Sequence, residues 1–322
     1  MSQTGERLGM DALAVVLNGP KALALRHLAL RTPTEADVVV DVAWSGISTG
    51  TERLLWQGRM PHFPGLGYPL VPGYEAVGRV VAAPADCVHR IDDAVLVPGA
   101  DCFADVRALF GATASRLVAP AARVVAIDPR LGERAVLLTL AATAHHAIGV
   151  HGASRPDLIV GHGVLGRLLA RLATGMAGAP PVVWETNPDR VSGALGYPVT
   201  TPERDARRDY RCICDASGDP AILDSLLARL APGGEIVLAG FYADRLSFAF
   251  PPAFMREARL RVAAEFRPAD LEAVSRMVEH GRLSLDGLIT HRMAATQADA
   301  AYRTAFDDPS CLKMTLDWRS SV

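Results

Sequence analysis

The sequence predicts an α/β protein in which a loop-rich β unit precedes a doubly wound parallel sheet. Its 322 residues are long for a single hydrophobic core, so two domains are expected. Short strand patterns separated by Gly and Pro turns fill residues 12–130, whereas strand and helix patterns alternate from residue 157 onward. A glycine-rich turn at residues 161–166 stands at the start of this alternation, between a strand and a helix.

Composition narrows the classes of function. Half of the residues (50%) are hydrophobic, which is ample for burial, and the net charge of −2 gives no reason to expect a nucleic-acid partner. The five cysteines are scattered without a disulfide pattern, which predicts a cytoplasmic protein. Because the N-terminus lacks the features of a signal peptide and charged or His residues interrupt the apolar segments, we expect no transmembrane segment.

The β unit is predicted to be antiparallel, and it contains one long irregular segment. Residues 58–73 carry four prolines, which disfavour regular structure, and a stiff loop of this length inside a compact domain is typical of a functional segment. A helix is expected at 132–150, where the chain leaves this unit. The other elements expected here are strands at 12–17, 23–28, 38–44, 76–81, 94–98, 115–118 and 122–127, and a short helix at 52–57.

The alternating second unit predicts a parallel sheet that binds its ligand at the carboxyl ends of the strands. We expect a first domain at 1–130, completed by 286–322, and a second domain at 131–285. The elements expected from residue 157 onward are strands at 158–160, 182–184, 210–215, 235–241, 260–264 and 313–318, and helices ending near 175 and at 222–230, 269–279 and 298–306.

The glycine turn has the residues that a dinucleotide site requires. Gly161 permits a tight turn, Gly163 lets the backbone approach a pyrophosphate, and Gly166 lets the helix pack against the strand. The helix N-terminus adds unpaired N–H groups and a partial positive charge. Glu185, 19 positions beyond the last glycine, would accept hydrogen bonds from the ribose hydroxyls. The predicted cofactor-binding residues are Gly161, His162, Gly163, Val164, Leu165, Gly166, Glu185, Thr186 and Asn187.

These residues favour NAD over NADP. A 2′-phosphate would face the Glu185 carboxylate, and the next residues, Thr186 and Asn187, supply no positive charge. The nearest cation is Arg190, which leaves residual use of NADP open. His162 lies inside the turn and is expected to be a neighbour of the cofactor rather than a base.

The domain layout and three motifs resemble the medium-chain dehydrogenase/reductase superfamily. Gly46-Ile47-Ser48 resembles its Gly-Ile-Cys, whose cysteine binds catalytic zinc. Gly73-Tyr74-Glu75-Ala76-Val77-Gly78 resembles its Gly-His-Glu-x-x-Gly, whose histidine is the second ligand, and residues 141–146 resemble the helix that supplies the third. The resemblance implies a GroES-like β-rich catalytic domain and a Rossmann domain.

Each of the three zinc ligands is replaced in this sequence. Ser48, Tyr74 and Thr143 stand at the matching positions, and none is the His, Cys or carboxylate that catalytic zinc needs. The closely spaced cysteines of the superfamily's structural zinc lobe are missing as well. We therefore predict a zinc-independent member without a bound metal.

Four longer stretches, 44–56, 68–75, 158–163 and 248–255, are similar to the bacteriochlorophyllide dehydrogenases of that superfamily. The similarity extends over nearly the whole chain. It implies NAD-dependent oxidation of the 3-(1-hydroxyethyl) group of 3-hydroxyethyl bacteriochlorophyllide a, or of the corresponding chlorophyllide, to a 3-acetyl group in bacteriochlorophyll biosynthesis. The substrate would be a chlorophyllide-type tetrapyrrole. A homodimer and contacts with other pigment-pathway enzymes are open hypotheses about partners.

Without zinc, a side chain must accept the hydroxyl proton of the substrate. Tyr74 would need a lowered pKa to act as this base, and packing is its alternative role. His145 and His146 have a reference pKa of about 6.5, which suits neutral pH. Adjacent helical residues diverge by about 100°, so at most one of the two is expected to face the cleft.

Other polar residues near the replaced ligands complete the candidate site. Glu75 would tune the pocket or take the proton through a relay, whereas Ser48 and Thr49 would orient or relay it. A group of aromatic residues could either stack on a flat tetrapyrrole or fill a core. These are Phe241, Tyr242, Phe248, Phe250 and Phe254.

Two other functions share these sequence features. A zinc-free quinone or enone reductase would have the same fold and the same missing ligands. A dinucleotide-binding scaffold that channels pigment between enzymes would need no base. Oxidation of a hydroxyethyl pigment with NAD separates the first function from both alternatives.

Overall fold

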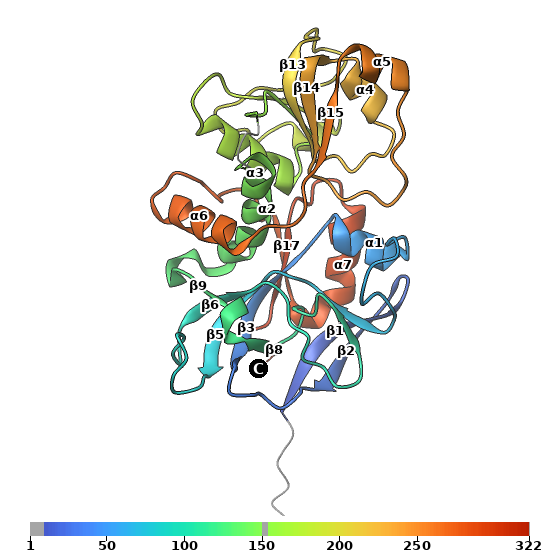
Figure 1. Ribbon diagram of the computed structural model, residues 1–322. Coiled ribbons are helices and arrows are strands. Elements are labelled where there is room, and N and C mark those ends of the chain that lie inside the picture. Colours follow the sequence, from blue (N-terminus) through green and yellow to red (C-terminus); the bar gives the residue numbers. More distant parts are fainter. Residues whose placement is uncertain (1–9, 150–153, 322) are drawn as a thin grey trace, which may run out of the picture.

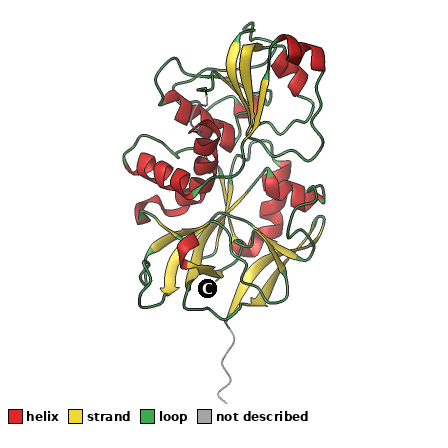
Figure 2. Cartoon of the chain, in the orientation of Figure 1, coloured by secondary structure: helices red, strands yellow, loops and turns green. Residues whose placement is uncertain are grey.

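The computed structural model describes residues 10–149 and 154–321, which form two lobes (Figure 1). Two sheets lie in the lower lobe, and a third sheet lies in the upper lobe with helices around it (Figure 2). Residues 1–9 and the end of the helix predicted to reach residue 150 lie outside the described residues.

The lower lobe contains a four-stranded sheet of order β2-β1-β4-β7 and a larger sheet of order β16-β17-β3-β5-β6-β9. A seventh strand of this second sheet, β8, pairs with β3. The strands are β1 (Asp11–Gly19), β2 (Ala22–Ala29), β3 (Asp37–Ile47), β4 (Leu70–Pro72), β5 (Ala76–Ala82), β6 (Ala94–Val97), β7 (Arg107–Leu109), β8 (Arg116–Pro120), β9 (Val125–Ala126), β16 (His291–Ala294) and β17 (Met314–Asp317).

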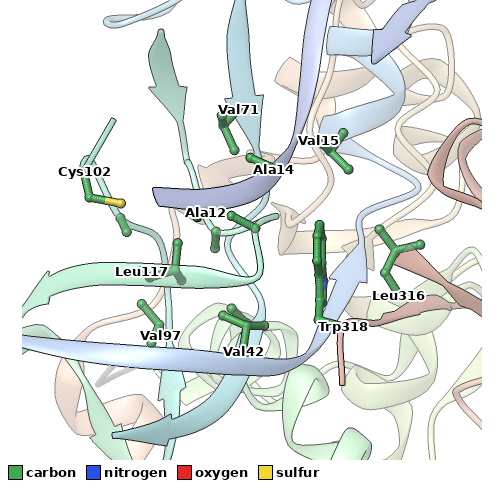
Figure 3. Packing of buried hydrophobic residues seen from close by; sticks show 14 of the residues in the cluster. Ala12, Ala14, Val15, Val42, Val71, Val97, Cys102, Leu117, Leu316 and Trp318 are labelled. Carbon is green, nitrogen blue, oxygen red and sulfur yellow. The ribbon is translucent and has the colours of Figure 1, made fainter. Parts of the chain in front are cut away.

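Side chains from both of these sheets meet in one hydrophobic core (Figure 3). Val15 of β1 and Leu117 of β8 are fully buried there, together with Leu316 and Trp318 from the end of the chain. The Trp318 indole N–H also donates to Ser45 Oγ at 2.8 Å. The C-terminal segment is therefore an integral part of the lower lobe.

The upper lobe is built on a parallel sheet of order β12-β11-β10-β13-β14-β15. The strand order reverses at β10, and such a switch point is where doubly wound sheets bind ligands. The strands are β10 (Leu158–Val160), β11 (Val182–Trp184), β12 (Val199–Thr200), β13 (Tyr210–Asp215), β14 (Leu230–Leu238) and β15 (Arg259–Val262). The predicted fold class is confirmed, whereas the residue boundaries of the domains stay predictions.

Seven α-helices and four 3₁₀ helices are assigned among the described residues. The α-helices are α1 (Thr51–Gln57), α2 (Leu138–Gly149), α3 (Val164–Thr174), α4 (Leu223–Leu227), α5 (Phe250–Met255), α6 (Pro268–Glu279) and α7 (Ala298–Asp307). The 3₁₀ helices are η1 (Ala121–Arg123), η2 (Pro129–Leu137), η3 (Pro188–Arg190) and η4 (Ala295–Gln297).

Several elements differ from the sequence-based expectation. The helix expected from residue 132 begins as 3₁₀ helix η2 and becomes α-helical only at Leu138, because Gly132 has non-helical φ and ψ angles of 53° and −133°. The segment 58–73 is not wholly irregular, since β4 lies within it and its Leu70 and Val71 are buried. The short strand β7, with which β4 pairs, was not expected.

Differences in the upper lobe have similar local causes. Helix α4 ends at Leu227, three residues before the expected end, and β14 begins at Leu230 rather than at 235. Helix α5 was not expected, because its sequence contains two prolines. Both prolines lie in the first turn, where a missing N–H costs no helical hydrogen bond.

Candidate active site

The glycine turn joins β10 to α3 at the switch point of the parallel sheet. Gly161 has a φ of 92°, which favours glycine. A Cβ atom at Gly166 would lie 1.8 Å from the Gly161 carbonyl oxygen, so only glycine fits. At Gly163, by contrast, a Cβ would meet nothing within 4 Å. This open space at the N-terminus of α3 suits a pyrophosphate.

Glu185 follows β11 and lies beside the turn. Its Oε2 accepts the backbone N–H of His162 at 2.9 Å, and its Oε1 accepts that of Asn187 at 2.8 Å. The side chain is 9% exposed. The carboxylate is therefore fixed by backbone donors at the edge of the site, and Thr186 beside it is exposed.

The His162 imidazole is part of the scaffold beneath the turn. It is fully buried, with Nδ1 2.6 Å from the Arg190 carbonyl and Nε2 2.9 Å from the Tyr197 hydroxyl. Burial lowers the pKa of His162 to about 4, so the ring is neutral at physiological pH. Its backbone N–H, rather than its ring, contributes to the cofactor edge. Val164 and Leu165 begin α3 directly after the turn.

Residues after Glu185 also hold the C-terminal segment. The Arg190 guanidinium donates to the carbonyl of Pro309 at 2.9 Å and to that of Cys311 at 3.4 Å. The Asn187 amide donates to the same Pro309 oxygen at 3.3 Å. The ribose side of the predicted cofactor site is thus bonded directly to the chain that leads into β17.

A pair of hydroxyl groups lies where two of the zinc ligands are replaced. Ser48 follows β3, Tyr74 lies between β4 and β5, and the Tyr74 hydroxyl donates to Ser48 Oγ at 2.7 Å. Burial, reinforced by the Glu75 charge, raises the pKa of Tyr74. The lowered pKa that a tyrosine base would need is therefore not found, and Tyr74 is a neutral hydrogen-bonding group.

Glu75 and Lys313 form a buried ion pair next to this hydroxyl pair, and each is 1% exposed. Burial raises the pKa of Glu75, although Lys313 opposes the rise. A Cβ at Gly46 would lie 2.2 Å from Glu75 Oε2, so the glycine makes room for the carboxylate. Glu75 Oε1 has no hydrogen-bond partner among the described residues. The sequence motifs indicated Glu75 but not Lys313.

Thr139, not Thr143, is the α2 residue that faces this cluster. The Thr143 hydroxyl donates to the Thr139 carbonyl at 3.0 Å and so remains on its own helix. The Thr139 side chain is 1% exposed and is close enough to Glu75 to oppose the rise of its pKa. Thr139 precedes Thr143 by one helical turn, so the two threonines lie on the same side of α2.

Glu52 is a second buried carboxylate that the sequence did not indicate as functional. It lies on α1 and is 1% exposed. Its Oε1 accepts the Ser48 backbone N–H at 2.9 Å, and its Oε2 accepts the Tyr302 hydroxyl at 2.5 Å. Thr49, in the turn that leads to α1, is partly exposed.

The two adjacent histidines share one partner. Nδ1 of His145 lies 2.7 Å from Asp270 Oδ1, and Nδ1 of His146 lies 2.9 Å from Asp270 Oδ2. Despite their predicted divergence, both rings turn to the same carboxylate on α6. Their described hydrogen bonds tie α2 to α6 and do not reach the hydroxyl pair, so a role as base stays a prediction.

The donor set at the replaced ligand positions does not fit zinc. Ser48 and Tyr74 offer neutral hydroxyl groups that are bonded to each other. Nowhere in residues 10–149 and 154–321 do three His, Cys, Asp or Glu residues gather in a way that could hold a metal ion. Catalytic zinc needs three such protein ligands.

The aromatic residues near the end of β14 do not fill a core. Tyr242 is partly buried, and its hydroxyl donates to Asp215 Oδ2 at 2.6 Å. The other four are exposed on the upper lobe, and they are Phe241, Phe248, Phe250 and Phe254. Across the part of the chain that the structure describes, no helix is long and apolar enough to cross a membrane.

Comparisons with known proteins complete the description of the site. No protein-family model matches the chain. The chain is 56% identical to 2-desacetyl-2-hydroxyethyl bacteriochlorophyllide A dehydrogenase of Rhodobacter capsulatus over 313 residues, which cover 97% of this chain and 100% of the relative. It is also 56% identical, with the same coverage, to the protein of that name from Cereibacter sphaeroides. An Escherichia coli CFT073 alcohol dehydrogenase in complex with NADH has the same fold, with a TM-score of 0.80 and 21% identity over 96% of this chain and 100% of that one.

Proposed function

The chain belongs to the family of 2-desacetyl-2-hydroxyethyl bacteriochlorophyllide a dehydrogenases, and we propose that it oxidises the hydroxyethyl group of a bacteriochlorophyllide to an acetyl group. The identity of 56% over 97% of the chain carries this proposal. The hydroxyl pair beside two buried carboxylates supports it, because alcohol oxidation needs a site that binds a hydroxyl group and accepts its proton.

The oxidant is a nicotinamide dinucleotide, and we propose NAD rather than NADP. When bound, its nicotinamide accepts the hydride that leaves the carbinol carbon. Gly161, Gly163 and the N-terminus of α3 would hold its pyrophosphate. Glu185 would accept the ribose hydroxyls and repel a 2′-phosphate. Arg190, the nearest cation, is already bonded to Pro309 and Cys311 carbonyls, which supports the same preference.

In the proposed reaction, Tyr74 and Ser48 bind the carbinol oxygen. The neutral Tyr74 hydroxyl orients Ser48 through its hydrogen bond. The Glu75–Lys313 ion pair lies next to both hydroxyl groups and sets the local electrostatic potential. The substrate O–H proton passes to a carboxylate of this cluster, and the carbinol C–H leaves as hydride. We propose zinc-independent chemistry, because hydroxyl groups replace the ligands at Ser48 and Tyr74.

The direct test is turnover of hydroxyethyl bacteriochlorophyllide a by the purified protein with NAD or NADP. We expect NADH to form in step with a pigment product that has lost two hydrogens, at a rate unaffected by prior dialysis against a chelator. Pigment binding without any NADH formation would support a scaffold instead. Turnover only of quinones with NADPH would support the reductase.

Tyr74→Phe tests whether the Tyr74 hydroxyl orients Ser48 in this reaction. It removes the hydroxyl that orients Ser48 and keeps the ring that packs edge-on against Phe110 at 5.6 Å. We expect kcat to fall about 10²-fold, as for loss of one oriented hydrogen-bond donor, with NAD affinity unchanged. An unchanged kcat would remove Tyr74 from the site.

For partners, we propose a homodimer formed through the edge strand β15. This strand pairs with β14 on one side only in the described sheet, and its Leu260 and Val262 are 39% and 76% exposed. An exposed, apolar sheet edge suits a second copy. In sedimentation experiments Val262→Lys should give a monomer, whereas Val88→Lys, at an equally exposed position in the lower lobe, should not. A monomeric wild-type protein would contradict this proposal.

We also propose a cytoplasmic location and contact with other pigment-pathway enzymes. All five cysteines are free and buried, which suits a reducing compartment. Cell fractionation tests the location, and co-purification from cells that make the pigment tests the contacts.

A further inference from the structure

Glu52 lies beside the hydroxyl pair, and the reaction described above assigns it no individual role. Its two carboxylate oxygens accept hydrogen bonds only from neutral groups, the Ser48 backbone N–H at 2.9 Å and the Tyr302 hydroxyl at 2.5 Å. A carboxylate that is 1% exposed and has no cation in contact is costly to keep ionised.

Glu75 differs from Glu52 in this respect, because the Lys313 ammonium contacts it directly. The cluster therefore contains two buried carboxylates and one buried cation. Lys313 and Glu75 act on Glu52 only at longer range, with opposite signs. Burial raises the pKa of Glu52 to about 7, although the hydrogen bonds from Tyr302 and Ser48 oppose the rise. Of the two carboxylates, Glu52 is the one without a cation in contact.

Ser48 lies between Glu52 and Tyr74. Its Oγ accepts the Tyr74 hydroxyl at 2.7 Å, so its own hydroxyl hydrogen is left to be donated elsewhere. The Ser48 backbone N–H donates a hydrogen bond to Glu52 Oε1. Ser48 thus contacts the Tyr74 hydroxyl through its side chain and the Glu52 carboxylate through its backbone N–H.

We propose that Glu52 accepts the hydroxyl proton of the substrate through Ser48, and that Tyr302 is the positioning residue for its carboxylate. This inference rests on the proposed alcohol oxidation. The substrate O–H bond breaks as its proton moves to Ser48 Oγ, and the Ser48 O–H bond breaks as its proton moves to Glu52. The carbinol carbon loses a hydride, and with it two electrons, to the dinucleotide. Glu52 returns its proton to solvent before the next turnover.

The first test measures Glu52 itself and needs neither substrate nor cofactor. Infrared spectra of the purified protein, recorded while the pH is lowered through 7, should gain the carbonyl band of a buried protonated carboxyl group. Glu52→Gln should abolish this band, whereas Glu75→Gln, the matched change in the ion-paired carboxylate, should retain it. A band that survives Glu52→Gln and disappears in Glu75→Gln would overturn the assignment.

The second test measures turnover against pH. Glu52→Gln should lower kcat by about 10²- to 10⁴-fold and should remove the loss of activity below neutral pH, with NAD affinity unchanged. Ser48→Ala should have a similar effect, and Ser48→Thr, which keeps the hydroxyl, should recover part of the rate. Tyr302→Phe leaves the acceptor in place. It should move the acid limb of the profile to higher pH, because it removes a hydrogen bond that stabilises the carboxylate.

The two proposals fail in different ways. A wild-type protein that does not oxidise the pigment would overturn the proposed function, and the proton transfer with it, even if the Glu52 band were found. A wild-type protein that oxidises the pigment, combined with a Glu52→Gln variant of normal kcat and an unchanged acid limb, would overturn only the role of Glu52. Tyr302→Phe keeps the test decisive if Glu52→Gln does not fold, because a structural role alone would not move the acid limb.

Discussion

The predicted cofactor site and the hydroxyl cluster are built in opposite ways. The predicted cofactor site is formed mainly by the backbone. Gly161 and Gly166 permit the turn, and main-chain N–H groups donate hydrogen bonds to Glu185. In the hydroxyl cluster, side chains from distant segments meet. Tyr302 and Glu52, for example, are 250 residues apart in the sequence, yet the Tyr302 hydroxyl donates to Glu52 Oε2 at 2.5 Å.

Because of this difference, we expect the two sites to tolerate different substitutions. A backbone site depends mainly on the shape of one short segment. The cluster depends on the balance between Glu52, Glu75 and Lys313, all of which are 1% exposed. We therefore expect substitutions in the cluster to act through charge and substitutions in the turn to act through shape.

The largest effect is expected from Lys313→Met. It leaves the Glu75 carboxylate buried without its cation, and breaking a buried ion pair in this way costs about 3–5 kcal/mol of unfolding free energy. Urea denaturation measures the loss. The double variant Lys313→Met with Glu75→Gln should recover most of it, because no buried charge is then left unpaired. Equal loss in the single and double variants would mean that packing, not charge, dominates.

The pH dependence of stability should expose opposite contributions from the two sites. Folding lowers the pKa of His162 from 6.5 to about 4, so between these values the unfolded chain binds the extra proton and stability falls as pH falls. Folding raises the pKa of Glu52 from 4.5 to about 7, so in that window the folded chain binds the proton and stability falls as pH rises. Each contribution is about 3 kcal/mol.

These contributions largely cancel in the wild-type protein, so its stability should vary little between pH 4.5 and 6.5 on their account. His162→Asn should leave a stability that falls with rising pH, and Glu52→Gln one that rises with it. Urea unfolding across this pH range measures both slopes. Identical slopes in the two variants would contradict the assignment.

Two alanine substitutions in the glycine turn should separate folding from cofactor binding. Gly166→Ala places a Cβ 1.8 Å from the Gly161 oxygen and should cost about 1–3 kcal/mol of stability together with NAD affinity. Gly163→Ala meets no protein atom within 4 Å and should leave the unfolding free energy unchanged. It should still weaken NAD binding, because the methyl group occupies the space proposed for the pyrophosphate. Equal losses of stability in the two variants would contradict the separate roles of Gly166 in folding and Gly163 in cofactor binding.

The smallest contrast is between two threonines of α2. Thr139→Val removes a hydroxyl that faces Glu75 and should change kcat by about tenfold or less. Thr143→Val removes only a hydrogen bond to the helix backbone and should leave kcat within about twofold. Steady-state kinetics with both variants decide which threonine belongs to the cluster, and a larger effect at Thr143 would reverse the assignment made here.

The cofactor turn could be predicted from sequence because its determinants are local. A strand, three glycines, a helix and Glu185 lie within about 30 residues, the length of one βαβ unit. The resemblance to known dehydrogenases also indicated Ser48, Tyr74 and Glu75. Lys313, Tyr302 and Glu52 could not be found in this way, since no local pattern marks a residue whose partner lies more than 200 positions away.

Errors in the predicted fold have equally local causes. The alternation of strands and helices was sufficient for the parallel sheet although β10 and β11 have only three residues each, because helical patterns separate the short apolar runs. Strands β4 and β7 have three residues each, too few to show any period, and prolines masked α5. Thr139 was not indicated, because sequence alone gives the face of a helix but not which residue on that face lies beside Glu75.

The end of the chain completes the half of the protein in which it began. Lys313 neutralises Glu75 and Trp318 fills the core laid down by β1 and β8, while Pro309 and Cys311 receive the bonds from Asn187 and Arg190. During synthesis, Glu75 therefore lacks its counterion until Lys313 has been made, after the whole upper lobe. A chain cut short by a dozen residues would keep its glycine turn and leave Glu75 without its cation.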